Sequence, residues 1–111
     1  MIVIEKTFHF SAAHRLVDHD GVCARLHGHN YRFTLEVGGD VCPSGPKRNM
    51  VLDYTDIGTV AKGILETLDH YFLNEVTEEE MTTAEFLCTW IYDRAIKTIP
   101  NLWAVRVSET A

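Results

Sequence analysis

The sequence predicts an α+β fold in which two helices cover one face of a four-stranded antiparallel sheet. Two observations carry this prediction. Apolar and polar residues alternate in stretches near both ends of the chain, which is typical of half-buried strands. Two central stretches instead repeat apolar residues at helical spacing. The resulting order is β, β, β, α, α, β, and we expect residues 1–111 to form a single domain.

The first two strands are predicted at residues 2–14 and 27–37. In both stretches the apolar side chains share one face and the polar side chains share the other. The apolar face ends in histidine in each case, with His14 closing the first strand and His27 and His29 opening the second. The connection between the two strands is long for a hairpin, which favours a functional loop.

A turn-rich connection, GGDVCPSGPKRN, is followed by MVLDY, which we interpret as a short third strand. The first helix is then predicted from Asp56 to His70. The second helix is predicted to begin at TTAE, where Thr82 and Glu85 can form a capping box, and to end at Pro100. WAVRVSE is the predicted last strand.

Composition excludes several classes of protein. The formal net charge is −6 and the basic residues are scattered, which argues against a nucleic-acid partner. No apolar run approaches membrane-spanning length, and the apolar run at the start is too short for a signal peptide, so we expect a cytoplasmic protein with no membrane partner. The three cysteines are odd in number and lack a CxxC motif, which makes a disulfide framework improbable.

Three histidines point to a metal site. Residues i and i+2 of a strand share a face, so His27 and His29 can converge on one ion, and antiparallel pairing would bring His14 beside them. Three imidazoles leave an open coordination position, which is the form of a catalytic zinc site. Two alternatives remain: a closed structural site with Cys23 as fourth ligand, and ordinary surface or core histidines.

Four further residues are candidates for acid–base chemistry or binding. Cys23 precedes His27 by four residues, and a thiolate near a metal is a competent base or nucleophile. Asp69 can hold His70 for proton transfer, although His70 can also simply complement the helix dipole. Glu109 ends an apolar strand face, where it either reaches solvent or accepts two N–H donors from a ligand such as an aminopyrimidinone ring.

Together these motifs resemble the pterin synthase family of the tunnelling fold, which includes 6-pyruvoyl-tetrahydropterin synthase and 6-carboxy-tetrahydropterin synthase of the QueD type. The resemblance extends over essentially the whole chain and is carried by FSAAHRL, CARLHGHNY, LDHYFLN, TTAE and SET. It implies roles for eight residues: zinc ligands His14, His27 and His29, proton-abstracting Cys23, a second acid–base unit of Asp69 and His70, pterin anchor Glu109, and Thr83 near the pterin.

The resemblance also implies an activity and an assembly. The Cys-x-x-x-His-Gly-His spacing is similar to that of the carboxy type, which converts 7,8-dihydroneopterin triphosphate to 6-carboxy-tetrahydropterin and releases acetaldehyde and triphosphate. The alternatives are a pyruvoyl enzyme and a zinc-stabilised pterin-binding module without chemistry. Three sheets would close into a barrel and two barrels would stack, with sites between subunits. Thr82 departs from the pattern, because many carboxy-type relatives have proline there.

Overall fold

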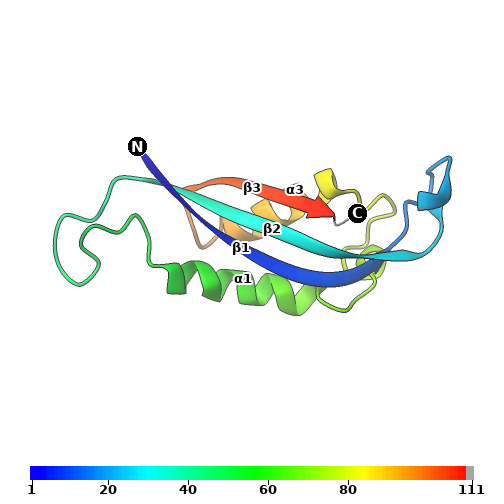
Figure 1. The fold of residues 1–111 in the computed structure, drawn as a ribbon, viewed down its shortest axis with the longest axis horizontal. Helices are drawn as coiled ribbons and strands as arrows, with labels where there is room; N and C mark the ends of the chain where they lie inside the picture. Colours follow the sequence, from blue (N-terminus) through cyan, green and yellow to red (C-terminus); the bar gives the residue numbers. More distant parts are fainter. Residues whose placement is uncertain (110–111) are drawn as a thin grey trace.

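The computed structural model describes residues 1–109, so Thr110, the last residue of the SET motif, and Ala111 lie outside the description that follows. The molecule is elongated, and its α-helices lie in sequence between the second and the third strand, as Figure 1 shows. The elements are β1 (Ile2–His14), the short 3₁₀ helix η1 (Val22–Ala24), β2 (His27–Gly39), α1 (Tyr54–Leu68), α2 (Leu73–Val76), α3 (Ala84–Ala95) and β3 (Leu102–Glu109).

The sheet is antiparallel, with strand order β1-β2-β3. The register pairs His14 with His27 and Ala12 with His29, so the predicted juxtaposition of the three histidines is confirmed. Farther along β2, Tyr31 pairs with Glu109 of β3. This register places every candidate residue of the strands at one end of the sheet.

The predicted strand at MVLDY is wrong, and the sheet of the described residues has three strands rather than four. Val51 and Leu52 form a bend and pack half-buried against the core. Asp53 then caps α1, because its side chain accepts the Thr55 N–H at 2.9 Å. Apolar residues in this short run therefore reflect packing of a connection, not pairing of a strand.

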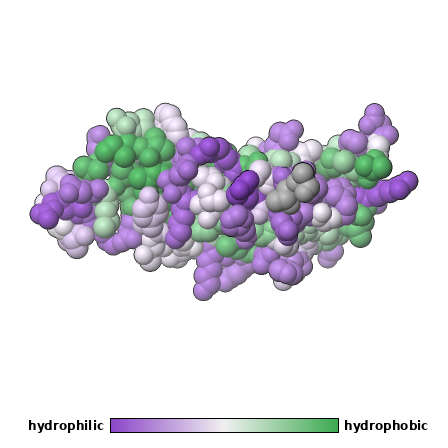
Figure 2. Space-filling model, viewed as in Figure 1, coloured by the Kyte–Doolittle hydropathy of each residue, from purple (hydrophilic) through white to green (hydrophobic). Residues whose placement is uncertain are grey.

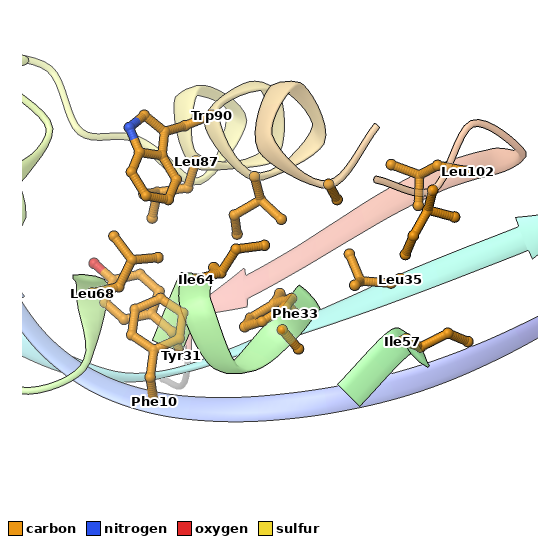
Figure 3. Packing of buried hydrophobic residues seen from close by; sticks show 14 of the residues in the cluster. Phe10, Tyr31, Phe33, Leu35, Ile57, Ile64, Leu68, Leu87, Trp90 and Leu102 are labelled. Atoms are coloured by element: carbon orange, nitrogen blue, oxygen red, sulfur yellow. The ribbon is translucent and has the colours of Figure 1, made fainter. Parts of the chain in front are cut away.

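Both long helices lie on one face of the sheet, and the core fills the space between the layers, as Figure 3 shows. Alternation along β2 sends every second side chain into this layer. The helices contribute the apolar stripes that the spacing predicts. The largest fully buried apolar side chains are Tyr31, Phe33, Leu35, Ile57, Leu68, Leu73, Leu87 and Ile91.

The helix ends differ from the predicted ones. Helix α1 spans Tyr54–Leu68 rather than 56–70, since His70 adopts a left-handed φ of 64° that a helix does not allow. Helix α3 is capped by Thr83, not Thr82, and ends at Ala95 before a series of turns, well short of Pro100. The short helix α2 is not predicted by the sequence pattern.

The molecule measures 54 × 24 × 23 Å, and its two ends differ. The histidines lie at one end. An apolar groove of about 250 Å³ lies near the start of β1 at the other, lined in part by Ile2, Val41, Met50 and Tyr54. Figure 2 shows apolar surface on the side of the view where Figure 1 places the N-terminus. Among the described residues, none of the helices has the length and apolar character needed to cross a membrane.

Candidate functional site

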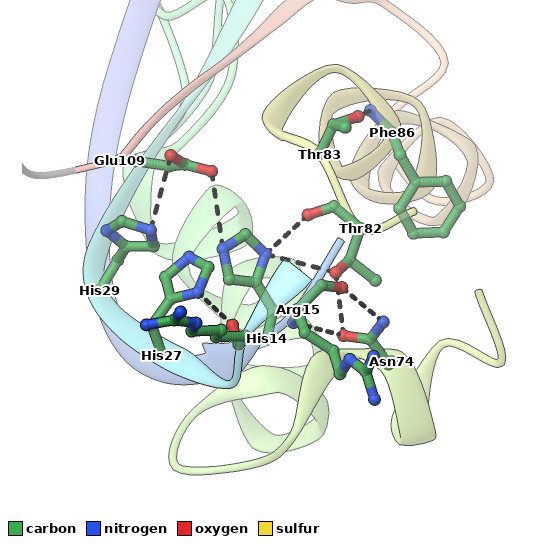
Figure 4. Close-up of polar contacts among 10 residues, drawn as sticks. His14, Arg15, His27, His29, Asn74, Thr82, Thr83, Phe86 and Glu109 are labelled. Carbon is green, nitrogen blue, oxygen red and sulfur yellow. Dashed lines mark hydrogen bonds and ion pairs between the residues drawn. The ribbon is translucent and has the colours of Figure 1, made fainter. Parts of the chain in front are cut away.

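Three histidines from two adjacent strands converge at the end of the sheet, as Figure 4 shows. One ring nitrogen from each of His14, His27 and His29 lies within 4.8 Å of the other two. The ring centroids are 4.5 to 5.1 Å apart. Zinc–nitrogen bonds are about 2.0–2.1 Å long, so small side-chain adjustments are enough for these nitrogens to share one ion.

Backbone carbonyls orient two of the three rings. His14 Nδ1 lies 2.9 Å from the Thr82 carbonyl oxygen, and His27 Nδ1 lies 2.7 Å from the Arg25 carbonyl oxygen. A carbonyl oxygen can only accept a hydrogen bond, so Nδ1 carries the proton in both rings. The opposite nitrogen, Nε2, is then left with its lone pair available for a metal, as in metal-bound histidines generally.

The buried ring of His14 has an unpartnered nitrogen. The side chain is 1% exposed, and its Nε2 makes no hydrogen bond in the structure. Burial is the main cause that lowers the pKa of His14; His27 and His29 act in the same direction, and the Thr82 carbonyl and Glu109 oppose it. A neutral, desolvated nitrogen facing two more imidazoles matches the donor set of a zinc site with an open position.

Glu109 faces the histidine cluster from the end of β3. Its carboxylate oxygens lie 4.0 Å from His14 Nε2 and 3.6 Å from His29 Nε2, too far for hydrogen bonds but close enough for electrostatic attraction. The side chain is 35% exposed, so one side of the carboxylate is open to a ligand. The structure thus places the predicted anchor beside the predicted metal ligands.

Tyr31 is a neighbour of the site that the sequence analysis did not single out. Its ring packs edge-on to His14 and His29 and stacks on Phe10, and its hydroxyl is buried without a hydrogen-bond partner. Burial, together with the negative charge of Glu109, raises the pKa of this hydroxyl. It therefore stays protonated and forms part of the apolar floor of the histidine cluster.

The Asp69–His70 pair lies at the free edge of β1. Asp69 Oδ1 lies 2.9 Å from His70 Nδ1 and also accepts the Ser11 N–H at 3.0 Å, while the His70 N–H donates to the Ser11 carbonyl. The Ser11 N–H is the main cause that lowers the pKa of Asp69, so this carboxylate is ionised at neutral pH. His70 has a left-handed backbone conformation, which costs free energy in a residue that carries a side chain. Such strained backbone conformations are concentrated at functional sites.

An open cleft of about 780 Å³ joins the two groups of candidate residues. Its walls are residues 11–13, 28–30 and 70–72, and His29 and His70 both line it. His70 is 80% exposed, so its ring projects into solvent rather than toward a packed partner. The cleft is large enough for a bicyclic ligand, since small-molecule sites generally measure about 300–1,000 Å³.

Cys23 lies in η1, within the loop between β1 and β2, and its carbonyl oxygen accepts the Leu16 N–H at 2.8 Å. The thiol is half-buried. Within residues 1–109, the group of side chains close enough to share a metal ion contains the three histidines and does not include Cys23.

Thr83 caps α3 by accepting the Phe86 N–H at 3.1 Å, the role that the sequence pattern assigns to Thr82. Thr82 is instead fully buried and contacts His14 and Asn74. Sequence reasoning missed Asn74 altogether. The only signal was its place in the LDHYFLN motif, because its partner Arg15 lies 59 positions away in sequence.

Comparison with known proteins agrees with this geometry. The family model described as 6-pyruvoyl tetrahydropterin synthase matches residues 3–111. A protein of Synechocystis named 6-carboxy-5,6,7,8-tetrahydropterin synthase is 36% identical over 99% of this chain and 88% of its own length. A Haemophilus influenzae protein of the same name is 44% identical over 71% of this chain, but the match spans only 57% of the relative.

A solved structure gives the same result for the fold. The 6-pyruvoyl tetrahydropterin synthase of Caenorhabditis elegans superposes with a TM-score of 0.85 at 27% identity, covering 98% of this chain and 89% of that one. The α+β prediction is confirmed, with the tunnelling fold as the architecture. A match over nearly the whole sequence, with the histidines, the Asp–His pair and the glutamate at one end of the sheet, shows that the chain belongs to the 6-pyruvoyl tetrahydropterin synthase family.

Proposed function

We propose that the protein is a zinc-dependent 6-carboxy-5,6,7,8-tetrahydropterin synthase, a lyase that acts on 7,8-dihydroneopterin triphosphate and releases acetaldehyde and triphosphate. Its product would enter the synthesis of queuosine and related deazapurines. The observation that carries the proposal is the cluster of three histidines with an open position, beside a cleft that also contains His70. The names of the Synechocystis and Haemophilus relatives favour the carboxy product.

His14, His27 and His29 are the proposed zinc ligands. Bound there, zinc would polarise the side-chain hydroxyls of the substrate and acidify the neighbouring protons. The protein holds the rings for this purpose through their Nδ1 hydrogen bonds, which leave His14 Nε2 and His27 Nε2 free. The apolar floor beneath them keeps His14 neutral and ready to bind.

Cys23 is the proposed base. Proton removal from a carbon next to a polarised hydroxyl needs a basic group close to the metal, and a divalent cation favours the thiolate form of a nearby cysteine. Cys23 belongs to η1, shortly before the start of β2, the strand that carries His27 and His29. A rearrangement of this loop around bound substrate would bring the thiol to the reacting carbon.

Asp69 and His70 are the proposed second acid–base unit. The Asp69 carboxylate holds His70 through Nδ1, which directs the other ring nitrogen outward for proton delivery or removal. The two backbone hydrogen bonds to Ser11 fix this pair against β1. The exposed ring is free to meet a substrate that lies in the cleft or on a neighbouring subunit.

Glu109 is the proposed anchor of the pterin ring. A carboxylate accepts two parallel N–H donors, and an aminopyrimidinone offers such a pair. Glu109 lies 3.6 Å from His29, so a pterin held by this carboxylate would extend its side chain toward the histidines. Thr83 is a proposed neighbour of the ring, in addition to its capping of α3.

We further propose that the protein works as a homo-oligomer, a trimer or a hexamer of the tunnelling fold. Strands β1 and β3 are both edges of the three-stranded sheet, and exposed edges favour pairing with further strands. The extent of 54 Å in a chain of 111 residues leaves much surface for contact between copies.

A product assay tests this function. Zinc-loaded protein incubated with 7,8-dihydroneopterin triphosphate should yield 6-carboxy-tetrahydropterin and acetaldehyde, both identified by mass spectrometry. A product that keeps the three-carbon side chain would establish the pyruvoyl activity that the family model and the C. elegans protein are named for. Tight binding without turnover would instead favour a pterin-binding module.

A further inference from the structure

One side chain outside the candidate site forms an unusually complete set of hydrogen bonds. The Asn74 side-chain oxygen accepts the Arg15 N–H and the Thr82 hydroxyl, each at 3.0 Å. The Asn74 side-chain nitrogen donates to the carbonyls of Arg15 at 2.7 Å and Glu80 at 3.0 Å. All four contacts of the amide therefore go to the protein, which is more than a helix-surface asparagine requires.

Two of these contacts hold the backbone directly after a proposed metal ligand. Asn74 bonds both the N–H and the carbonyl of Arg15, so it acts on this residue like a neighbouring strand. Arg15 follows His14 in sequence, at the point where β1 ends and the loop begins. Asn74 therefore fixes the direction in which the chain leaves His14.

A third contact reaches the His14 ring itself through Thr82. The Thr82 hydroxyl lies 3.0 Å from Asn74 and 3.3 Å from His14 Nδ1, and the Thr82 carbonyl accepts from the same Nδ1 at 2.9 Å. Thr82 is 0% exposed and His14 1%, so water does not compete for these bonds. Figure 4 shows the path from Asn74 through Thr82 to His14.

The corresponding support of His27 is local. Its Nδ1 bonds the carbonyl of Arg25, two residues earlier in the chain, so its orientation depends on one short segment. The support of His14 comes from Thr82, which is 68 positions away, and from Asn74, which is 59 positions from Arg15. Orientation of His14 therefore depends on how the segment from α2 to α3 docks on β1.

We propose that Asn74 is a positioning residue of the metal centre, which acts through Thr82 and the Arg15 backbone to hold His14 in its ligating orientation. The inference rests on the proposed function only in that the three histidines bind a divalent cation. Zinc binding and docking of the 74–82 segment are then coupled, and each stabilises the other. Loss of an outer partner of a metal-bound histidine typically lowers metal affinity about 10- to 100-fold.

Two pairs of variants test the proposal by zinc titration against a chromophoric chelator. Thr82→Val removes the hydroxyl at nearly constant shape, and Thr82→Ser retains it. Asn74→Ala removes all four hydrogen bonds of the Asn74 side chain. The matched control is Thr77→Val, which removes a hydroxyl on the same segment that bonds the Leu73 carbonyl instead. We expect Asn74→Ala and Thr82→Val to weaken zinc binding about 10- to 100-fold, while Thr82→Ser and Thr77→Val remain within about threefold of the wild type.

Two further readouts separate positioning from general destabilisation. The visible spectrum of bound cobalt(II) should change in Thr82→Val and Asn74→Ala but not in Thr77→Val, since it reports the ligand geometry. In the metal-free protein, hydrogen exchange at the Arg15 amide should accelerate in Asn74→Ala, because that amide donates to Asn74. If Asn74→Ala does not fold, Thr82→Val carries the comparison.

The outcomes distinguish this inference from the function on which it rests. Wild-type protein that binds neither zinc nor cobalt would contradict both the metal centre and the role of Asn74. Wild-type binding with equal affinity and equal cobalt spectra in all variants would contradict the role of Asn74 alone. A weakening of the same size in Thr77→Val would assign the effect to stability and would also overturn the proposal.

Discussion

The three-histidine cluster and the Asp69–His70 pair differ in how the protein holds them. His14 is 1% exposed, its cluster is backed by the core, and partners more than 50 residues away orient it. His70 is 80% exposed and is supported by Asp69 and by the edge of β1. The first group is organised before any ligand arrives, whereas the second presents its ring to solvent.

This difference indicates how the site is assembled. A metal centre gains affinity when its ligands are already oriented, because less side-chain entropy is lost on binding. An exposed acid–base group gains catalytic power only when another surface excludes water around it. We therefore propose that the histidine cluster is complete within one chain and that the surface of a second copy completes the Asp69–His70 pair.

The largest effect is expected from removing a ligand of the organised cluster. Loss of a residue that only hydrogen-bonds a metal ligand lowers metal affinity by up to about 100-fold. His29→Ala removes a ligand itself, so zinc affinity should fall by more than this, and activity should disappear with the metal. Elemental analysis after dialysis measures the stoichiometry, predicted to be one zinc per chain in the wild type. His9→Ala, on the opposite face of β1, is the matched control and should retain the metal. Full zinc occupancy in His29→Ala would remove His29 from the ligand set.

The next effect concerns Cys23, which should matter for turnover but not for the metal. Cys23→Ala should lower kcat on the order of 10²- to 10⁴-fold, the usual contribution of an acid–base group, with zinc content unchanged. Cys42→Ala, in the connection between β2 and α1, is the control thiol. Zinc loss in Cys23→Ala would support the closed four-ligand site instead, and unchanged turnover would exclude Cys23 from the mechanism.

A smaller effect is expected at Glu109, which lies between the histidines and solvent. Glu109→Gln keeps the shape but loses the charged acceptor, so pterin affinity should fall about tenfold, toward the low end for a charged hydrogen bond because the side chain is 35% exposed. Isothermal titration with a pterin measures this loss. Glu36→Gln, whose carboxylate pairs with Arg106, is the control. Unchanged pterin affinity in Glu109→Gln would mean that Glu109 does not bind the pterin and acts only through its negative charge near the histidines.

Alternation alone predicted the geometry of the histidine cluster. A period of two puts His27 and His29 on one face, and a single antiparallel pairing then determines the partner of His14. The contacts that orient His14 could not be predicted in this way. They depend on where Asn74 and Thr82 dock, which is decided by tertiary packing across dozens of residues.

The errors at helix and strand ends have the same cause. Thr82 and Thr83 are equivalent as caps in sequence, and only the burial of Thr82 against His14 leaves Thr83 to cap α3. Val51 and Leu52 satisfy a strand pattern, but they form a bend and pack half-buried against the core. Local sequence patterns predict which face of a helix or strand is buried more reliably than they predict which residues it contacts.

Co-assembly of two inactive variants tests the central claim most directly. His29→Ala should lack metal, and His70→Asn should lack the imidazole while keeping the left-handed backbone, which asparagine tolerates. Each should be inactive alone. Co-expressed with different tags and purified through both, the mixed assembly should exceed either parent by more than about tenfold, because some sites combine an intact metal centre with an intact His70 from another copy. Mixed assemblies that remain inactive, or a wild-type monomer that is fully active, would show that His70 serves its own chain and would contradict the account.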